Sequence, residues 1–223
     1  MSASPPVTPA APLVAGSRRA HGKARVRAGL LSAARRLFAR QGVAATTMDD
    51  IARRAGVSRA TTFNYFPSKH LLLEALVHEM EARFLQVIEA QLGQPATAAA
   101  RVRALFSWTA KRVCDAPELS RVLIGASETT FGATRNSGVR TARVHRALMR
   151  VLQAGRREGN VRTDLSCEIL AEIVGGSYAG MLHAWRVGRH YPLARRLAEA
   201  AAALEDFLSV SAARRRRERR GAA

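Results

Sequence analysis

Residues 46–69 read TTMDDIARRAGVSRATTFNYFPSK, and this segment constrains the chain more than any other. Thr47 stands before an apolar pattern of helical spacing, and Asp50 follows three residues later, as in a capping box. Gly56 can adopt the left-handed conformation that ends a helix, and Ser58 is a favourable N-cap for the next one. The segment therefore predicts a helix, a tight turn and a second helix, which is the helix-turn-helix arrangement.

The second predicted helix has an unusual outer face. It ends before Pro67, which cannot extend a helix, and Thr62 and Phe66, four residues apart, are expected to face the core. Arginine can read guanine, asparagine can read adenine, threonine can contact a thymine methyl and tyrosine can bind phosphate. The outer residues are Arg59, Thr61, Phe63, Asn64 and Tyr65. A solvated surface is the alternative, but the combination of residue types favours double-stranded DNA as a partner.

This segment resembles the DNA-binding domain of the TetR family of bacterial transcriptional regulators. The likeness covers residues 24–76 and combines an apolar preceding helix, a glycine, a capped short helix, a glycine turn and an aromatic second helix closed by proline. The positions that carry it are Leu30, Leu31, Ala34, Leu37, Phe38, Gly42, Thr46, Thr47, Ile51, Ala52, 55–58 and 63–69. One position departs from the family pattern, because Thr62 stands where a large apolar residue is usual. Its hydroxyl needs a partner in the core.

The resemblance implies roles in DNA binding for the matching positions. The residues that it implies for phosphate contacts are Thr47, Tyr65 and Lys69. The residues that it implies for the major groove are Arg59, Thr61 and Phe63, with Asn64 as a further candidate. It also implies repression as the usual mode of action, ended when a small molecule releases the protein from its operator.

The rest of the chain has the pattern of helices. Alanine is abundant, aromatic residues are few, long runs lack proline and glycine, and no alternating strand pattern is evident. We therefore expect an all-α fold, in which an N-terminal three-helix helix-turn-helix DNA-binding domain precedes a helical ligand-binding and dimerisation domain. The expected divisions are a disordered basic tail at 1–21, the DNA-binding domain at 22–70, the effector-binding and dimerisation domain at 71–212 and a basic tail at 213–223.

Positive charge agrees with a nucleic-acid partner. The chain has 36 Lys and Arg against 17 Asp and Glu, a formal net charge of +19, which attracts polyanions at long range. An acidic membrane surface fits the same charge, and so does a GC-rich genome that encodes arginine in place of lysine. The basic runs near both ends leave two interpretations open: contact with DNA, or a solvated chain end without a role.

Catalytic motifs are incomplete in this sequence. His78 and Glu79 begin like a zinc-protease helix, but Ala82 stands where the second zinc ligand is needed. Residues 175–179 nearly form a nucleophile elbow, yet the last glycine comes one place late and the strand-turn-helix context is missing. The histidines have no metal-ligand spacing. We therefore expect no enzyme activity, no cofactor and no metal site.

Cysteine spacing and hydropathy bear on location. Cys114 and Cys167 lie far apart and have no paired spacing, so they are interpreted as reduced thiols of a cytoplasmic protein. The most apolar segment, 169–185, contains Glu172 and His183, which are costly in lipid. We expect a buried helix there and no membrane partner.

The last two predicted helices, 165–187 and 193–210, are candidates for dimerisation. Gly176 and Gly180 lie four residues apart on the first of them, so another backbone can approach closely. The resemblance implies that this pair joins its copy from a second subunit in a four-helix bundle. Intramolecular packing of the same small residues is the alternative.

An effector pocket among the middle helices is also implied by the resemblance. A small-molecule pocket is mainly apolar with a few polar handles, although each such residue can equally be plain core. The candidate lining residues are Phe106, Trp108, Phe131, His145, Met149, Tyr178, Met181 and Trp185.

Together these observations predict a homodimeric, sequence-specific transcriptional regulator. Two reading helices would enter successive major grooves of a near-palindromic operator, and an unknown small-molecule effector would change their separation. The alternative is a basic helical protein that coats DNA or an anionic surface without reading sequence. An enzyme with an unrecognised site is a more distant third hypothesis.

Overall fold

The computed structural model describes the backbone of residues 15–131 and 135–210, and the side chains of 20–127 and 143–210. Within these ranges the chain is helical and contains no strand, so the predicted all-α fold is confirmed. The helices are α1 (Ala15–Ala45), α2 (Met48–Ala55), α3 (Arg59–Tyr65), α4 (Lys69–Leu92), α5 (Ala98–Asp115), α6 (Pro117–Phe131), α7 (Arg135–Arg157), α8 (Cys167–Val187) and α9 (Leu193–Leu208).

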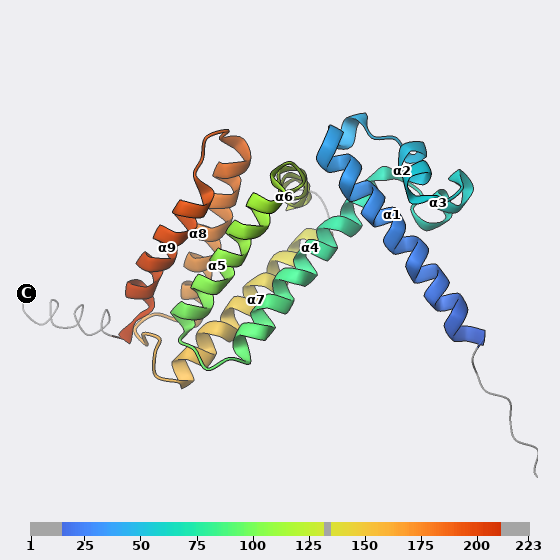
Figure 1. The fold of residues 1–223 in the computed structure, drawn as a ribbon. Helices are drawn as coiled ribbons and strands as arrows, with labels where there is room; N and C mark the ends of the chain where they lie inside the picture. Colours follow the sequence, from blue (N-terminus) through green and yellow to red (C-terminus); the bar gives the residue numbers. More distant parts are fainter. Residues whose placement is uncertain (1–14, 132–134, 211–223) are drawn as a thin grey trace, which may run out of the picture.

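The helices form two groups joined by α4. Figure 1 shows α1, α2 and α3 at one end of the molecule, and α5, α7, α8 and α9 at the other. Helix α4 runs from the first group into the second, and α6 lies across the junction, where it packs against both α1 and α4. The two groups are therefore connected by packing as well as by the chain.

The first group has a core of its own. Its buried side chains come from α1, α2, the start of α4 and the loop residue Phe66, and two leucines of α6, Leu119 and Leu123, belong to the same cluster. Thr62 and Phe66 are 0% and 5% exposed, as their spacing predicted. The Thr62 hydroxyl donates a hydrogen bond of 3.0 Å to the Ser58 carbonyl, which supplies the partner that a buried hydroxyl needs.

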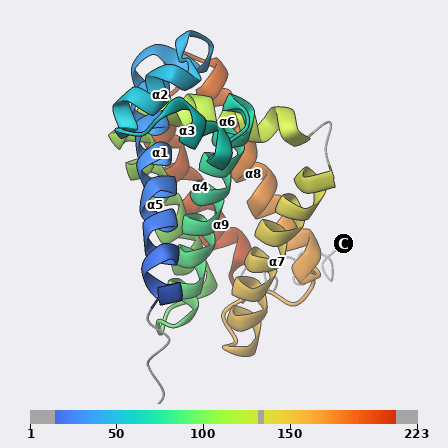
Figure 2. The same ribbon diagram turned by 90° about the vertical axis from the view of Figure 1, so that its right-hand side faces the viewer.

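Helix α1 begins earlier than predicted. Residues 15–21 were expected to be disordered, but they form the first turns of α1, so that part of the tail prediction is wrong. Once residues 30–38 anchor the helix in the core, each added residue gains a backbone hydrogen bond, and alanine and arginine favour this growth. Figure 2 shows α1 running well past α2 and α3. Residues 1–14 and 211–223, which hold the rest of both predicted tails, lie outside the described residues.

The second group forms a larger helical core. Helix α5 packs closely against α9, and α7 against α8, with Val102, Leu105, Val151 and Leu170 among the most buried side chains. The predicted final pair is present as α8 and α9. None of the helices in the described residues combines the length and apolarity needed to cross a membrane.

Candidate DNA-binding site and effector cavity

The start of α2 forms the predicted capping box. The Thr47 side chain accepts a hydrogen bond of 3.1 Å from the Asp50 backbone, and the Thr47 backbone donates one of 3.1 Å to the Asp50 carboxylate. The Thr47 hydroxyl also donates a hydrogen bond of 2.6 Å to the Asp50 carboxylate. This bond first, and then the one from the Thr47 backbone, holds the pKa of Asp50 below its ordinary value. Gly56 ends the helix with φ 68° and ψ 33°, the left-handed conformation expected of it.

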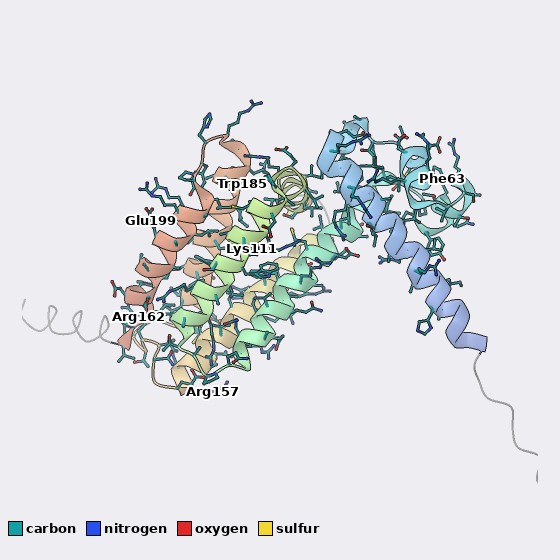
Figure 3. All side chains as sticks on the ribbon, in the orientation of Figure 1. Phe63, Lys111, Arg157, Arg162, Trp185 and Glu199 are labelled. Carbon is teal, nitrogen blue, oxygen red and sulfur yellow. The ribbon has the colours of Figure 1, made fainter. Side chains whose placement is uncertain are left out.

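Helix α3 presents most of its side chains outward. Ser58 caps it by accepting a hydrogen bond of 3.1 Å from the Thr61 backbone. Arg59 and Asn64 are exposed, while Thr61 and Phe63 are half-buried. Phe63 lies on the outer end of the first helix group, away from the rest of the molecule (Figure 3). The predicted reading residues of α3 therefore share an accessible surface.

Arg59 is held in place by its neighbours. Its guanidinium lies 3.0 Å from the Asp49 carboxylate of α2 and 5.5 Å from the centre of the Phe63 ring. The Arg59 and Asp49 side chains are 70% and 50% exposed. Such an exposed ion pair contributes about 0–1 kcal/mol, so Arg59 can exchange Asp49 for a nucleic acid at low cost.

Lys69 has a structural role that sequence reasoning missed. Its ammonium group donates hydrogen bonds to the carbonyls of Ala44 at 3.3 Å and Thr46 at 2.9 Å, where α1 ends. Because an ammonium group has three donors, one remains for a phosphate. Thr47 and Lys69 therefore lie near one another at the junction of α1, α2 and α4. Tyr65 is half-buried and packs against the core of the first group.

A cavity of about 510 Å³ lies between the two helix groups and within the second. Its walls come from α4, α5, α6, α7 and α8, with one residue, Arg35, from α1. The lining is mainly apolar, as is usual for small-molecule sites. Arg35 forms an ion pair of 2.5 Å with Glu79 of α4 at the wall shared with the first group. A ligand in this cavity would thus touch elements of both groups.

Aromatic side chains form one part of the cavity wall. The Phe84 ring lies 5.5 Å from the ring of Tyr178 and 6.2 Å from that of Trp108, measured between centroids. The Tyr178 hydroxyl is 3.1 Å from the Thr109 hydroxyl, and burial raises the pKa of Tyr178 to about 12. Tyr178 therefore stays neutral at physiological pH and offers a polar handle inside an apolar wall.

Sequence relatives match the first helix group most clearly. Residues 30–76 match the bacterial regulatory proteins of the tetR family. An uncharacterised helix-turn-helix transcriptional regulator of Mycobacterium tuberculosis is 35% identical over 91 residues, which cover 41% of this chain and 45% of that protein. The chain thus spans about half the length of the first curated relatives that it matches. The transcriptional repressor KstR2 of Rhodococcus jostii is 26% identical over 155 residues, covering 66% of this chain and 74% of the repressor.

Solved structures match the arrangement of helices over most of the chain. A TetR-family transcriptional regulator of Pectobacterium atrosepticum is 26% identical, with a TM-score of 0.66 over 85% of this chain and 95% of that one. This chain is thus similar to TetR-family regulators in the sequence of residues 30–76 and in its fold. The regulator FadR of Bacillus subtilis, solved with stearoyl-CoA, has the same fold, with 20% identity and a TM-score of 0.66 over 82% of this chain and 97% of FadR.

Three of the pocket residues expected from the TetR resemblance line the cavity. They are Trp108, His145 and Tyr178. The prediction is wrong for Phe106, Met149, Met181 and Trp185, which are absent from the lining. Phe106 packs against the Tyr178 ring at 5.5 Å, and the Arg121 guanidinium covers the Trp185 ring at 4.3 Å, so packing occupies both rings. The two methionines pack against the core. The Phe131 side chain lies outside the described residues.

Sequence reasoning missed the part of the cavity wall that α4 provides. Val77, Met80, Glu81 and Phe84 line it, although α4 had been interpreted as a connection between domains. Their spacing of three and four residues marks one helical face, and Glu81 interrupts that otherwise apolar face. A carboxylate on an apolar stripe was the available signal for a site.

Proposed function

We propose that this protein is a homodimeric, sequence-specific DNA-binding regulator of transcription, acting as a repressor that a small molecule releases from a near-palindromic operator. The single observation that carries the proposal is the capped α3 with an exposed outer face, inside a domain of TetR type. The formal net charge of +19 supports attraction to the DNA backbone. Because bacterial DNA lies in the cytoplasm, we expect the protein to act there.

The division of labour along the chain follows from the two cores. We propose residues 22–70 as the DNA-binding domain and 71–212 as the effector-binding and dimerisation domain. Leu72 and Leu76 of α4 pack into the first core, so the boundary lies within one continuous helix. The base-reading candidates remain Arg59, Thr61 and Phe63, with Asn64 beside them. Thr47, Tyr65 and Lys69 remain the candidates for phosphate contacts.

The outward face of α8 supports a homodimer. Ile169, Ile173 and Val187 are 44%, 38% and 63% exposed, which is unusual for large apolar side chains. Gly176 and Gly180 continue the same stripe at helical spacing, and a Cβ added to either would meet nothing. A second copy of the chain could therefore approach α8 closely, and two-fold symmetry would present two α3 helices to two half-sites.

Shared residues support coupling between the cavity and the DNA-binding domain. Leu76 and Val77 of α4, and Leu119 and Leu123 of α6, line the cavity and also belong to the core of the first helix group. A ligand that fills the cavity therefore presses on side chains that position that group. Such a ligand shifts DNA binding only if it prefers one arrangement of the two groups over the other.

Selection of bound sequences from random DNA at moderate salt tests this function. We expect enrichment of an inverted repeat whose half-sites are separated by about one helical turn or a multiple of it. The alternative, a basic protein that coats DNA or an anionic surface without reading sequence, predicts no enriched site. Recovery of random sequences with the same salt dependence would support that alternative and contradict the regulator.

A further inference from the structure

One carboxylate in the cavity wall lacks a hydrogen-bond partner. Both oxygens of Glu81 are inaccessible to solvent and accept no hydrogen bond from the described residues. The Glu81 side chain is 10% exposed, and His78 Nδ1 lies 3.7 Å from its Oε2, which is within ion-pair range when His78 is protonated but beyond hydrogen-bond distance. Burial of an unpartnered carboxylate costs free energy, whereas a hydrogen-bond donor with positive charge offsets that cost.

The other charged groups of the cavity are paired or exposed. Arg35 is engaged by Glu79, with both side chains 34% exposed. Arg83, Arg112 and Glu172 line the cavity but are exposed to solvent. Charges in contact with water gain little from a ligand, whereas a desolvated charge gains much more. Glu81 is thus the buried, unsatisfied charge in the described part of the lining.

Aromatic rings line the same cavity as this carboxylate. Phe84 follows Glu81 by three residues on the same face of α4, and its ring contacts those of Trp108 and Tyr178, all four residues lining the cavity. Aromatic faces attract cations, and a carboxylate supplies the charge-assisted hydrogen bond. The wall therefore combines the two groups that recognise an organic ammonium ion.

We propose that the effector of this regulator is a lipophilic organic cation, whose protonated amine donates to Glu81 while its apolar body fills the cavity. This inference rests on the proposed function for its regulatory meaning, but not for binding itself. Because Glu81 lies on α4, the helix that also enters the core of the DNA-binding domain, the amine would act directly on the connecting element.

Three probes that share the same alkyl chain but differ in head group test the proposal. They are decylammonium, decanol and decanoate, titrated calorimetrically into the full-length protein below their micelle concentrations. We expect decylammonium to bind most tightly. Glu81→Gln should weaken decylammonium binding by about tenfold or more, as for loss of one charge-assisted hydrogen bond, and leave decanol binding nearly unchanged. Glu118→Gln, at an exposed position of α6 outside the cavity lining, is the matched control and should change neither.

Stability of the free protein provides a second measurement. Since the Glu81 oxygens have no hydrogen-bond partner among the described residues, Glu81→Gln should leave the melting temperature unchanged or raise it. Tightest binding of decanoate, no measurable binding of decylammonium, or equal affinities of wild type and Glu81→Gln for decylammonium would overturn the proposal.

Measuring the release of operator DNA distinguishes a failure of the cation proposal from a failure of the proposed effector control. If decanol or decanoate releases the selected operator and decylammonium does not, effector control stands and the cation proposal fails. If decylammonium binds through Glu81 without affecting operator affinity, the binding site stands and the proposed control by this ligand fails.

Discussion

At the residue scale, Thr62 shows how a departure from a family pattern is accommodated. Its hydroxyl lies in the core of the DNA-binding domain and donates to the Ser58 carbonyl, which already accepts from the Thr62 backbone N–H at 3.0 Å. The hydroxyl therefore has a hydrogen-bond partner, but the Ser58 carbonyl would remain hydrogen-bonded without it. Its contribution to folding is small compared with the apolar burial around it.

Thr62→Val tests this interpretation. Since the Ser58 carbonyl keeps its backbone partner, valine removes no required hydrogen bond and adds apolar burial. We expect the free energy of unfolding to stay equal or rise by up to about 1 kcal/mol in denaturant titrations. Thr62→Ala, which leaves a small void, should instead lower it by about 1 kcal/mol. A larger loss for valine than for alanine would mean that the hydroxyl matters more than its geometry indicates.

Arg59 and Tyr65 are expected to affect DNA binding in different ways. Arg59→Ala should cost about 1–3 kcal/mol on the preferred site and relax base preference at one position of each half-site. Tyr65→Phe should weaken binding to all sequences alike, by about tenfold for one hydrogen bond to phosphate. Fluorescence anisotropy with preferred and scrambled duplexes measures both. Equal losses on both duplexes for Arg59→Ala would contradict its assignment to base reading.

Lys69 is a poorer probe of phosphate binding than its position first suggests. Because its ammonium group also binds the carbonyls of Ala44 and Thr46, removing it would disturb the end of α1 together with any DNA contact. Loss of DNA affinity in a Lys69 variant therefore requires a parallel measurement of stability before it is assigned to the phosphate.

At the element scale, the orientation of α2 and α3 depends on short-range caps. The Thr47 and Asp50 capping box begins α2, Gly56 ends it, and Ser58 begins α3. Every one of these interactions joins residues three or four apart in sequence. The starts and ends of the two helices are thus set by local chemistry.

The capping box makes α2 sensitive to acid. The pKa of Asp50 is lowered in the folded protein, so the ionised carboxylate stabilises the fold at pH values above its ordinary value of 3.8. That contribution is lost as the pH falls through the lower folded pKa. Asp50→Asn should therefore be less stable than wild type near neutral pH, and the difference should shrink at low pH. A difference in melting temperature that does not depend on pH would contradict this cause.

At the scale of the whole molecule, buried arginines hold distant segments together. Arg101 is 2% exposed and donates to both oxygens of Glu158, at 3.0 and 2.9 Å, and to the carbonyls of Gln91 and Gln94. These bonds hold the pKa of Glu158 below its ordinary value. They join the turn after α4 to the end of α7, so the wall of the cavity that α4 provides is fixed at its far end.

A substitution on the exposed apolar face of α8 tests whether this face is the dimer interface. Ile173→Glu places a charge on the exposed apolar stripe, so we expect it to convert a dimer to monomers, measured by sedimentation, and to weaken operator binding. The monomer should remain folded, because Ile173 is not part of its core. Leu71→Glu, which changes a similarly exposed leucine of α4, is the control and should leave the oligomeric state unchanged. A dimeric Ile173→Glu variant would exclude this face as the interface.

The helix-turn-helix could be read from the sequence because its caps and its glycine turn join near neighbours. The inward positions of Thr62 and Phe66 also followed from helical spacing alone. The cavity could not be read in this way, because its walls come from several helices whose mutual orientation depends on packing. Phe106 and Trp185 were predicted to line the cavity on the same grounds as Trp108 and Tyr178, yet of these four residues only Trp108 and Tyr178 line the cavity. Glu81 was not singled out from the sequence, although a charge on an apolar stripe was a signal for it, and only the tertiary structure left its carboxylate buried without a hydrogen-bond partner.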